Sequence, residues 1–417
     1  MPTAKIECAV IGGGIIALSS ALALQERGLS VTVIAPGSMV GTASWGNAGH
    51  VAVEQVEPLA SMDTIRSFPR RLFWRGGALS LPPRDIAYWL PFSLRLLRAA
   101  RPSRFRAGTK ALTETLAMAM PAWRRLVDTL EAPDLLQEAG HFILWENART
   151  ARAGRDAWAG PQIGTTRVRG ASPQELAHLA AHLPFQPADA IRFSGSGQIA
   201  DMDQLACAME ARFRAQGGER RDAHVIGLTS HADGTVALAL DDGAKLQANA
   251  VLVAAGAASG ELMRPLGHRV PIIAERGYHI QAPASRWPED MPPVVFEDRS
   301  MIVTRFRGAL RAASFVEFGA LSSAPDPRKW ARLRRHAAEL GLPFDTEPMP
   351  WMGARPTLPD YLPAIGRSRR AANLFYAFGH QHLGLTLGPL TGEAVAAIMH
   401  GKEPAFDLTP FDLKRFG

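Results

Sequence analysis

A short glycine-containing segment near the N-terminus has the residue types and spacing of a phosphate-binding loop. The segment reads VIGGGIIA and contains Gly12, Gly14 and Ala17. Glycine at position 12 permits a tight strand-to-helix turn, glycine at position 14 lets the backbone approach a pyrophosphate, and a small residue at position 17 keeps the helix close to its strand. The helix N-terminus would present free N–H groups to the phosphates. The segment therefore predicts a dinucleotide-binding site, with a ligand-free glycine turn as the alternative.

The segments on either side of this loop predict a βαβ unit. Residues 6–11 are apolar and predict a strand, 15–28 predict a helix, and 30–34 read SVTVI and predict a second strand. Ala35 follows that strand, at the position where such units usually carry an acid that accepts hydrogen bonds from the adenosine ribose. We therefore predict that a dinucleotide binds without this carboxylate. Either Ser38 or loop backbone takes the ribose hydroxyls, or the other half of the dinucleotide supplies most of the binding.

The same region argues against a dinucleotide that carries a 2′-phosphate on its ribose. Such a phosphate is usually met by an arginine near the end of the second strand. No arginine occurs in the next several residues after Ala35. NADP is therefore not the expected ligand.

The composition bounds the class of protein. The chain has 417 residues, of which 47% are hydrophobic and 20% charged, as is ordinary for a soluble globular protein of one large or two medium domains. Its two cysteines, Cys8 and Cys207, cannot form a disulfide framework, which favours reduced thiols and a cytoplasmic location. We expect no signal peptide and, without a run of about 18 apolar residues, no membrane-spanning helix. The net charge of +7 favours anionic partners.

Three further segments extend the pattern along the chain. They read TASWGNAGH, after the second strand, AVLVAAGAASGELM, and GHQHLGLTLGPLTGEA near the end. Together with the glycine loop they resemble the D-amino-acid oxidase-like family of FAD-dependent oxidoreductases, and most closely the bacterial D-amino-acid dehydrogenases of the small-subunit type. The resemblance spans the whole chain and is most specific in its first 60 and last 70 residues.

This resemblance implies FAD as the cofactor and an α/β fold of two domains. A Rossmann-like FAD-binding domain would be combined with a discontinuous α+β substrate domain that contains a mixed or antiparallel sheet. The expected FAD-binding domain comprises residues 1–58, 196–275 and 352–417. The expected substrate-binding domain comprises residues 59–195 and 276–351.

The resemblance also implies which residues bind FAD. Glycines in the second and last segments would let the backbone pass beside the pyrophosphate and the isoalloxazine ring, and Asn47 would donate to the flavin edge. N–H groups at the start of the last helix would face the N1–C2=O edge, which becomes negative in the reduced flavin. The residues expected to bind FAD are Gly12, Gly14, Ile15, Ile16, Ser44, Trp45, Gly46, Asn47, Ala48, Gly49, Val225, Gly256, Gly379, Gly384, Leu385 and Thr386.

Three residues are the candidates for contact with substrate. Arg355, in WMGARPTLPD, matches the place where amine-oxidising relatives hold the substrate carboxylate, and its planar fork suits two parallel hydrogen bonds. Tyr278, in ERGYH, would donate to the same carboxylate, with His279 on the other face; a buried core tyrosine is the alternative. His382 lies in the last segment, where some relatives have arginine. The sequence predicts no metal site, because the cysteines are far apart and HQH lacks further ligands.

The reaction implied by the resemblance is hydride transfer from the Cα of a D-amino acid to flavin N5. The resulting imine would hydrolyse to a keto acid or cyclise. Trp351, Met352 and Tyr361 near the matched positions point to a small or cyclic apolar side chain such as that of proline or hydroxyproline. Electrons would pass to a quinone or another acceptor. The alternatives are an O2-dependent oxidase of glycine, sarcosine or D-amino acids, a flavin enzyme acting on modified tRNA, and a dinucleotide-binding module without catalysis.

Residues 86–106 are the candidate surface for a membrane. Arginines in this stretch alternate with Leu, Trp and Phe, as in a helix that lies on an anionic bilayer. Prolines at positions 91 and 102 weaken the pattern, and a solvated basic helix is the alternative. We expect peripheral association with the inner face of the cytoplasmic membrane at most. A nucleic-acid partner is not expected, because aromatic residues are not interleaved in a basic patch.

Overall fold

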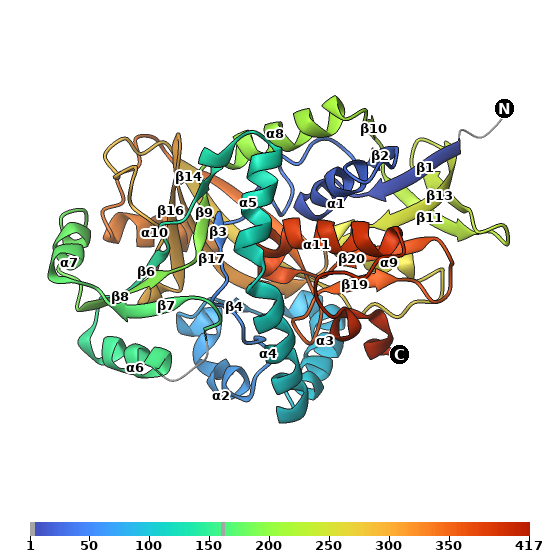
Figure 1. Ribbon diagram of the computed structural model, residues 1–417. Coiled ribbons are helices and arrows are strands. Elements are labelled where there is room, and N and C mark those ends of the chain that lie inside the picture. The colour runs from blue at the N-terminus through green and yellow to red at the C-terminus, as the bar shows by residue number, and fades with distance from the viewer. Residues whose placement is uncertain (1–4, 160–162) are drawn as a thin grey trace.

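The computed structural model describes residues 5–159 and 163–417. Two large sheets and a small three-stranded sheet organise this part of the chain. Figure 1 shows the first large sheet on the right and the second on the left, with helices across the front and the lower edge. The chain passes repeatedly between the two large sheets.

The first sheet is built from both ends and the middle of the chain. In sheet order its strands are β10 (Glu219–Arg221), β2 (Val31–Ile34), β1 (Lys5–Ile11), β13 (Lys245–Val253), β12 (Val236–Leu240) and β11 (Val225–Ser230), with β20 (Leu374–Phe378) beside β13 and β19 (Ala364–Arg367) beside β20. The pairs β10–β2, β2–β1, β1–β13 and β13–β20 are parallel. The hairpins β11–β12 and β12–β13 are antiparallel, as the turn sequences Asp-Gly at 233–234 and 242–243 predict.

Two helices from opposite ends of the chain pack together on this sheet. They are α1 (Ile15–Gln25) and α11 (Gly384–Met399). Most residues of both helices are buried, because α1 also contacts α8 (Met202–Ala215) and α11 also contacts α5 (Ala119–Thr129). Trp123 of α5 donates its indole N–H to the carbonyl of Leu385 at 3.1 Å. The C-terminal helix is thereby fixed beside the glycine loop at the start of α1.

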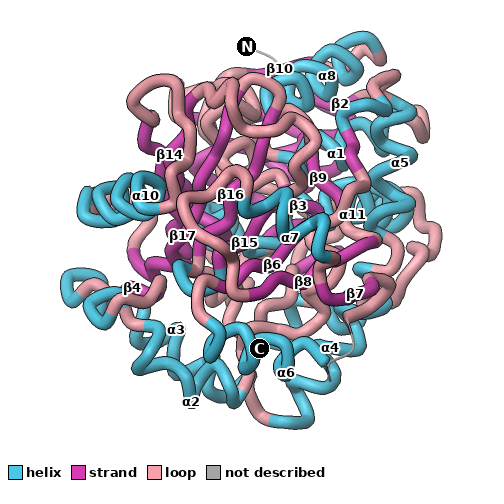
Figure 2. The backbone as a smooth tube through the Cα atoms, turned by 90° about the vertical axis from the view of Figure 1, so that its left-hand side faces the viewer, coloured by secondary structure: helices cyan, strands magenta, loops and turns pink. Residues whose placement is uncertain are grey.

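The second sheet has both parallel and antiparallel strand pairs, and its strands are spread over the view in Figure 2. In sheet order its strands are β18 (Met349–Thr357), β14 (Ile273–Ala282), β17 (Ala309–Gly319), β16 (Met301–Phe306), β15 (Val294–Phe296), β6 (His141–Trp145), β8 (Asp189–Ser194) and β7 (Arg167–Gly170), with β4 (Leu79–Ser80) beside β17. The β15–β6 and β17–β4 pairs are parallel and the others antiparallel. Helices α10 (Pro327–Glu339) and α3 (Ile86–Ala99) pack on β14 and β17.

The remaining elements join and cover the two large sheets. The small sheet has the order β3 (His50–Val51), β9 (Gly197–Ile199) and β5 (Leu136–Gln137). The other α-helices of the described residues are α2 (Met62–Arg71), α4 (Pro102–Leu116), α6 (Ala148–Ala159), α7 (Pro173–Ala180) and α9 (Ser259–Met263).

Local sequence signals place several helix ends correctly, and one proline signal is wrong. Ser172 and Glu175 form the capping box that their spacing predicts at the start of α7. Pro102 begins α4, where its missing N–H costs no intrahelical bond. Pro91, which predicted an interruption, lies inside α3 without ending it. Packing of α3 on the second sheet outweighs the hydrogen bond lost at that proline.

Two of the expected domain boundaries fall inside strands. The boundary at 275/276 lies within β14, and that at 351/352 lies within β18. These two strands pair with each other in the second sheet. The chain therefore passes between the expected domains along continuous strands rather than through linkers.

A buried cluster of charges lies between β14, β17 and α10. The Glu317 carboxylate accepts hydrogen bonds from Arg276 and Lys329, and the side chains of all three residues are fully buried. The hydroxyl of Tyr278 also donates to Glu317, at 2.8 Å. Loss of one partner from such a group leaves the others charged and buried, which is far more costly than the loss of an exposed ion pair.

We expect the substitution Glu317→Gln to lower the free energy of unfolding by about 3–5 kcal/mol, because Arg276 and Lys329 would lose their shared counter-charge. Urea unfolding of the purified protein measures this change. The matched control is Glu347→Gln, since Glu347 is 77% exposed in its pair with Arg334 and should cost less than about 1 kcal/mol. Equal effects from the two substitutions would contradict the prediction.

Candidate active site

The glycine loop has the tight geometry that its sequence predicts. Gly12 has φ +128°, and a Cβ at this position would lie 2.3 Å from the carbonyl oxygen of Ala254 at the end of β13. Gly14 is the N-terminal cap of α1. Ser44 accepts a hydrogen bond from the N–H of Ile15 at 3.0 Å, and Ile16 continues the first turn of the helix. The loop from 44 to 49 is thus joined to the start of α1.

The second sheet holds this 44–49 loop from the other side. Arg311 of β17 donates to the carbonyl of Trp45 at 2.8 Å and to that of Asn47. His279 of β14 lies 3.1 Å from the carbonyl of Gly46 and donates through Nδ1. Ala48 follows these contacts in the chain, and Asn47 on its other side uses its side-chain oxygen to accept from Gly49 N–H at 2.9 Å. The Asn47 oxygen is therefore occupied within the loop, while its amide N–H groups can still donate.

Arg355 lies on the face of the second sheet that carries these contacts. Strand register pairs Glu275 with Arg355, Gly277 with Gly353 and His279 with Trp351, so these side chains share one face.

Room for the Arg355 guanidinium comes from a neighbouring glycine. A Cβ at Gly277 would lie 2.4 Å from Nη2 of Arg355, so the guanidinium occupies the space that a side chain there would need. Arg355 donates to Glu275 at 3.4 Å and to the carbonyl of Phe315 at 3.2 Å, and its side chain is 28% exposed. It is held in place, with part of its guanidinium accessible to a ligand.

Glu275 was not among the predicted site residues, yet it is central to the surroundings of Arg355. It accepts hydrogen bonds from Thr357 at 3.0 Å and from Tyr361 at 3.2 Å as well as from Arg355. Burial and the nearby Glu275 carboxylate raise the pKa of Tyr361 well above its usual range, so its hydroxyl remains protonated and donates. The alternation of Glu275, Gly277 and His279 along the strand is a sequence signal that could have placed Glu275 on this face.

Tyr278 and Met352 lie on the opposite face of the sheet, which corrects their predicted position beside the substrate. The Tyr278 hydroxyl donates to Glu317 and accepts from the N–H of Asp326 at 3.1 Å, beneath α10. Met352 is the register partner of Tyr278 and packs against the hydrophobic cluster that contains Tyr278. The alternation of side chains in a strand is the physical reason, because a residue next to Gly277 must face away from Arg355.

The last glycine segment brings His382 toward Arg355. Burial and the positive charge of Arg355 lower the pKa of His382 to about 3, so the ring is neutral at ordinary pH. His382 belongs to the short helix η6 (Gln381–Leu383), which leads directly into α11 at Gly384.

The start of α11 is fixed by contacts with distant segments. Thr386 accepts through its hydroxyl from the N–H of Ala52 at 2.9 Å, and the Leu385 carbonyl binds Trp123. Gly379, with φ +81°, ends the strand that precedes this segment. The predicted flavin-edge residues of the C-terminal segment therefore lie next to the segment that follows the 44–49 loop.

A buried group of His50, Glu54 and His141 lies beneath this junction, and it could hold a metal ion. Its three ligand atoms lie within 4.8 Å of one another. His50 bonds Glu54 at 3.0 Å and the Gly197 carbonyl at 3.2 Å, while His141 bonds the Ser196 hydroxyl at 3.1 Å. Burial and the neighbouring His50 lower the pKa of His141 to about 3. Residue spacing did not reveal this group, because its members are far apart in sequence.

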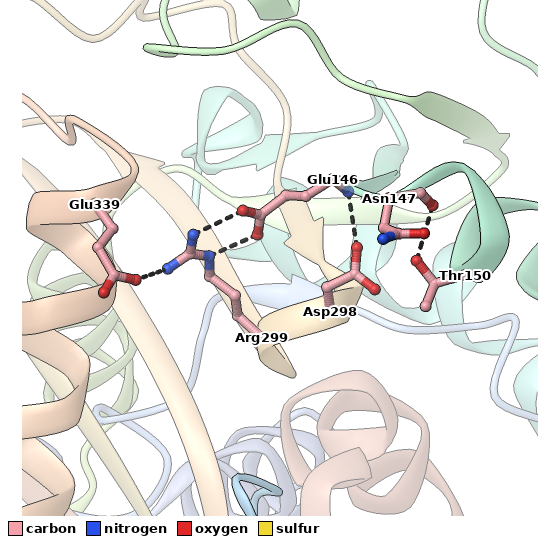
Figure 3. Close-up of a pocket in the computed structure, with 6 residues that line it drawn as sticks. All are labelled: Glu146, Asn147, Thr150, Asp298, Arg299 and Glu339. Carbon is pink, nitrogen blue, oxygen red and sulfur yellow. Dashed lines mark hydrogen bonds and ion pairs between the residues drawn. The ribbon is translucent and has the colours of Figure 1, made fainter.

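Ion pairs line a separate pocket of about 350 Å³ on the second sheet (Figure 3). Its residues are Glu146, Asn147, Thr150, Asp298, Arg299 and Glu339. Arg299 binds Glu146 through two hydrogen bonds of 2.6 Å and also binds Glu339. None of the predicted site residues lines this pocket. We interpret it as an ion-pair network that ties α10 to the end of β6.

Comparison with known proteins establishes the family. The DAO family, described as FAD dependent oxidoreductase, matches residues 7–398. The chain belongs to this family. It is 30% identical to a D-amino-acid oxidase of Bradyrhizobium diazoefficiens over 422 residues, with 98% of each chain covered. It is 28% identical to D-amino acid dehydrogenase 2 of Pseudomonas aeruginosa, with 96% of each covered.

A solved structure shows the same fold. The glycine oxidase of Geobacillus kaustophilus matches with a TM-score of 0.72 and 23% identity, and 99% of each chain is covered. The predicted family, the α/β fold class with a mixed sheet, and FAD as cofactor are therefore confirmed.

The residues around the glycine loop fit the FAD of the DAO family. Gly256, three residues after the end of β13, has φ +58°, and a Cβ there would meet no atom within 4 Å, so space is open beside the backbone. The N-terminus of α1 and the 44–49 loop border the same edge of the first sheet. Val225, another predicted contact, begins β11 shortly after β10. These features provide N–H donors and side-chain-free backbone, which a bound pyrophosphate needs.

Histidine burial should make the stability of this DAO-family protein depend on pH. Burial alone lowers the pKa of His380 to about 3 from its ordinary value of 6.5, and His380 bonds the Thr391 hydroxyl at 3.1 Å. A folded-state pKa below the unfolded value means that the contribution is fully present above pH 6.5 and is lost as the pH falls toward 3. We expect His380→Gln to reduce the loss of unfolding free energy between pH 7 and pH 5 by about 2 kcal/mol. Urea unfolding at both pH values measures this, and parallel losses in both proteins would contradict it.

Proposed function

We propose that the protein oxidises a D-amino acid whose carboxylate is bound by Arg355. The observation that carries this proposal is the setting of Arg355. Its guanidinium fills the space over Gly277 and is anchored by Glu275, and its side chain as a whole is 28% exposed. A positioned guanidinium binds a carboxylate with two charge-assisted hydrogen bonds and fixes its orientation. The names of the bacterial relatives support a D-amino acid as the substrate.

The residues around Arg355 hold the substrate without offering a strong base. His382 is neutral because its pKa is lowered to about 3, so it can accept or donate a hydrogen bond but takes up no proton near neutral pH. The substrate amine must therefore be neutral before oxidation. It either binds in the neutral form or loses a proton after binding. Bound FAD supplies the acceptor for the hydride that leaves Cα. The imine of a primary amine then reacts with water to give a keto acid and ammonia, whereas the imine of a proline-like substrate is already part of its ring.

Aromatic side chains beside this site favour an apolar substrate side chain. Trp351 stacks on His279 with ring centroids 4.8 Å apart, and it approaches Trp45 edge-on at 6.1 Å. This cluster borders the same sheet face as Arg355. It supports a small or cyclic apolar substrate such as D-proline or hydroxyproline.

We expect Arg355→Met to lower kcat/KM for D-proline or D-alanine by at least about 100-fold, equivalent to about 2.7 kcal/mol, because the carboxylate loses its charged partner. Arg355→Lys should recover part of the loss. Dye-linked turnover measures both variants, with FAD content determined from the absorbance spectrum. The control is Arg367→Met, on β19, whose guanidinium bonds only the Ala372 carbonyl among the hydrogen bonds of the described residues. A loss below about threefold in Arg355→Met would contradict the role.

Anaerobic bleaching of the flavin separates the proposed activity from its alternatives. We expect D-amino acids to reduce the flavin and modified tRNA to leave it oxidised. Reoxidation is then compared with O2 and with a quinone analogue, since a dehydrogenase reacts faster with the quinone. Faster reoxidation by O2 would favour the oxidase instead.

The exposed face of α3 supports a membrane as the site of electron delivery. Five large apolar residues on this helix are between 43% and 56% exposed: Ile86, Tyr88, Leu90, Leu94 and Leu97. Arg95 and Arg98 lie on the same helix, and Arg101, Arg104 and Arg106 follow at the start of α4. α2 lies beside α3 in both views and adds exposed Met62 and Phe68 (Figures 1 and 2). Among the described residues no helix is long and apolar enough to cross a bilayer.

We propose that this face lies on an anionic bilayer and brings the enzyme to a membrane quinone. The double substitution Leu94→Ser with Leu97→Ser should weaken binding to phosphatidylglycerol vesicles by at least about tenfold, because two apolar anchors are lost. Vesicle flotation measures the bound fraction. The control is Ile226→Ser on β11, where Ile226 is 65% exposed on another element. Unchanged flotation of the double variant, or equal binding to neutral vesicles, would count against the membrane surface.

A further inference from the structure

Strand β10 of the first sheet brings side chains close to Ala35. Ala35 is the position where the usual ribose-binding acid is missing. β10 pairs in parallel with β2, with Arg221 opposite Ile34, and the N–H of Ala35 donates to the Arg221 carbonyl at 3.1 Å. The carboxyl ends of both strands therefore lie at the edge that carries the glycine loop. Figures 1 and 2 both show β10 beside β2.

The guanidinium of Arg220, on β10, lies close to Ala35 and the glycine loop. A Cβ placed on Gly13, the middle residue of the glycine loop, would lie 3.1 Å from Cβ of Ala35 and 3.3 Å from Nη2 of Arg220. Arg220 donates to the carbonyl of Gly37, and its side chain is only 11% exposed. The guanidinium thus lies between the glycine loop and the loop that follows β2.

A carboxylate on α8 fixes the orientation of Arg220. Nη1 of Arg220 donates to Glu210 at 3.1 Å, and Glu210 also binds Arg214 at 3.0 Å. Two cations share this one acid, so the group keeps a net positive charge. A guanidinium has five N–H donors, which leaves donors beyond those to Glu210 and Gly37.

We propose that Arg220 binds the adenosine half of FAD and replaces the acid that is absent at position 35. It would donate to the ribose hydroxyl oxygens, where the usual acid accepts from them. An arginine in place of an acid reverses the charge beside the ribose, and this changes the selectivity between riboses with and without a 2′-phosphate. An acid at position 35 repels a 2′-phosphate on the ribose, whereas an arginine attracts one. The site therefore accepts a 2′-phosphorylated adenosine ribose at least as well as an unmodified one.

One carboxylate near this position offers the opposite chemistry. Asp222 is exposed and accepts from the N–H of Gly37 at 3.0 Å. It could in principle accept from the ribose as the usual acid does. A Cβ built on Gly13 would lie within 3.3 Å of both Ala35 and Arg220, whereas the printed partner of Asp222 is Gly37, and this is why the arginine is favoured.

The test uses full-length protein from which FAD has been removed. FAD rebinding is followed by quenching of flavin fluorescence, and ADP-ribose and 2′-phospho-ADP-ribose are compared as competitors. In the unmodified protein we expect 2′-phospho-ADP-ribose to compete at least as well as ADP-ribose, and about tenfold better at low ionic strength. Arg220→Gln should weaken FAD binding by at least about tenfold and shift the competitor ratio at least fivefold toward ADP-ribose. Ala35→Asp should reverse the ratio.

Two neighbouring substitutions make the result specific to Arg220. Arg221→Gln is the matched control, because Arg221 is the next residue on β10, is 47% exposed and pairs with Asp242; it should leave the ratio unchanged. Asp222→Asn should leave FAD binding unchanged. Loss of FAD binding in Asp222→Asn alone would assign the ribose to the acid and overturn the proposal.

A purely structural role of Arg220 is also distinguishable. If Arg220→Gln lowers the melting temperature and FAD affinity but keeps the competitor ratio of the unmodified protein, Arg220 only clamps the loop, and the proposal fails. A preference for ADP-ribose in the unmodified protein overturns it as well. These measurements involve no amino-acid turnover, so their outcome is independent of the substrate proposed above.

Discussion

A buried arginine joins the two sheets on which the site is built. Arg311 belongs to β17 of the second sheet, yet it donates to the carbonyls of Trp45 and Asn47 in the loop that leads from the first sheet. Its Nε is held by Gln281 at 2.6 Å, and its guanidinium lies over the Trp45 ring at 5.2 Å. Carbonyl groups in a partly buried loop need donors, and here a side chain of the second sheet supplies them. The 44–49 loop and the face of the second sheet that carries Arg355 therefore cannot be positioned independently.

Strand β14 carries two different sets of polar contacts on its two faces. Arg276 and Tyr278 face α10 and bind Glu317 in the buried charge cluster. Glu275 and His279 face the other way, toward Arg355 and the 44–49 loop. Both faces are buried, so the strand carries polar groups on either side that must each be satisfied locally. A one-residue shift of this strand would exchange the two sets of groups.

The sequence predicts best what depends on neighbouring residues. The glycine loop, the Asp-Gly hairpins and the capping box at Ser172 each follow from short patterns, and the structure contains all of them. Tyr278 was expected beside Arg355, because the pattern ERGYH shows alternation but does not show which of its residues share a face with Arg355. Arg220 was missed for a different reason: only the pairing of β10 with β2 brings it to Ala35. The grouping of His50, Glu54 and His141 likewise needs the small sheet.

The space over Gly277 links two positions that are far apart in the sequence. The guanidinium of Arg355 lies where a side chain at position 277 would be, 2.4 Å from a Cβ built there. Any residue larger than glycine at 277 would displace the arginine, and a shorter residue at 355 would leave an unfilled space. The guanidinium is the end of a flexible side chain, so a small residue at 277 would move it aside and change the direction in which it points. Under the proposed role of Arg355, the glycine at 277 thus sets the orientation of the group that binds the substrate carboxylate.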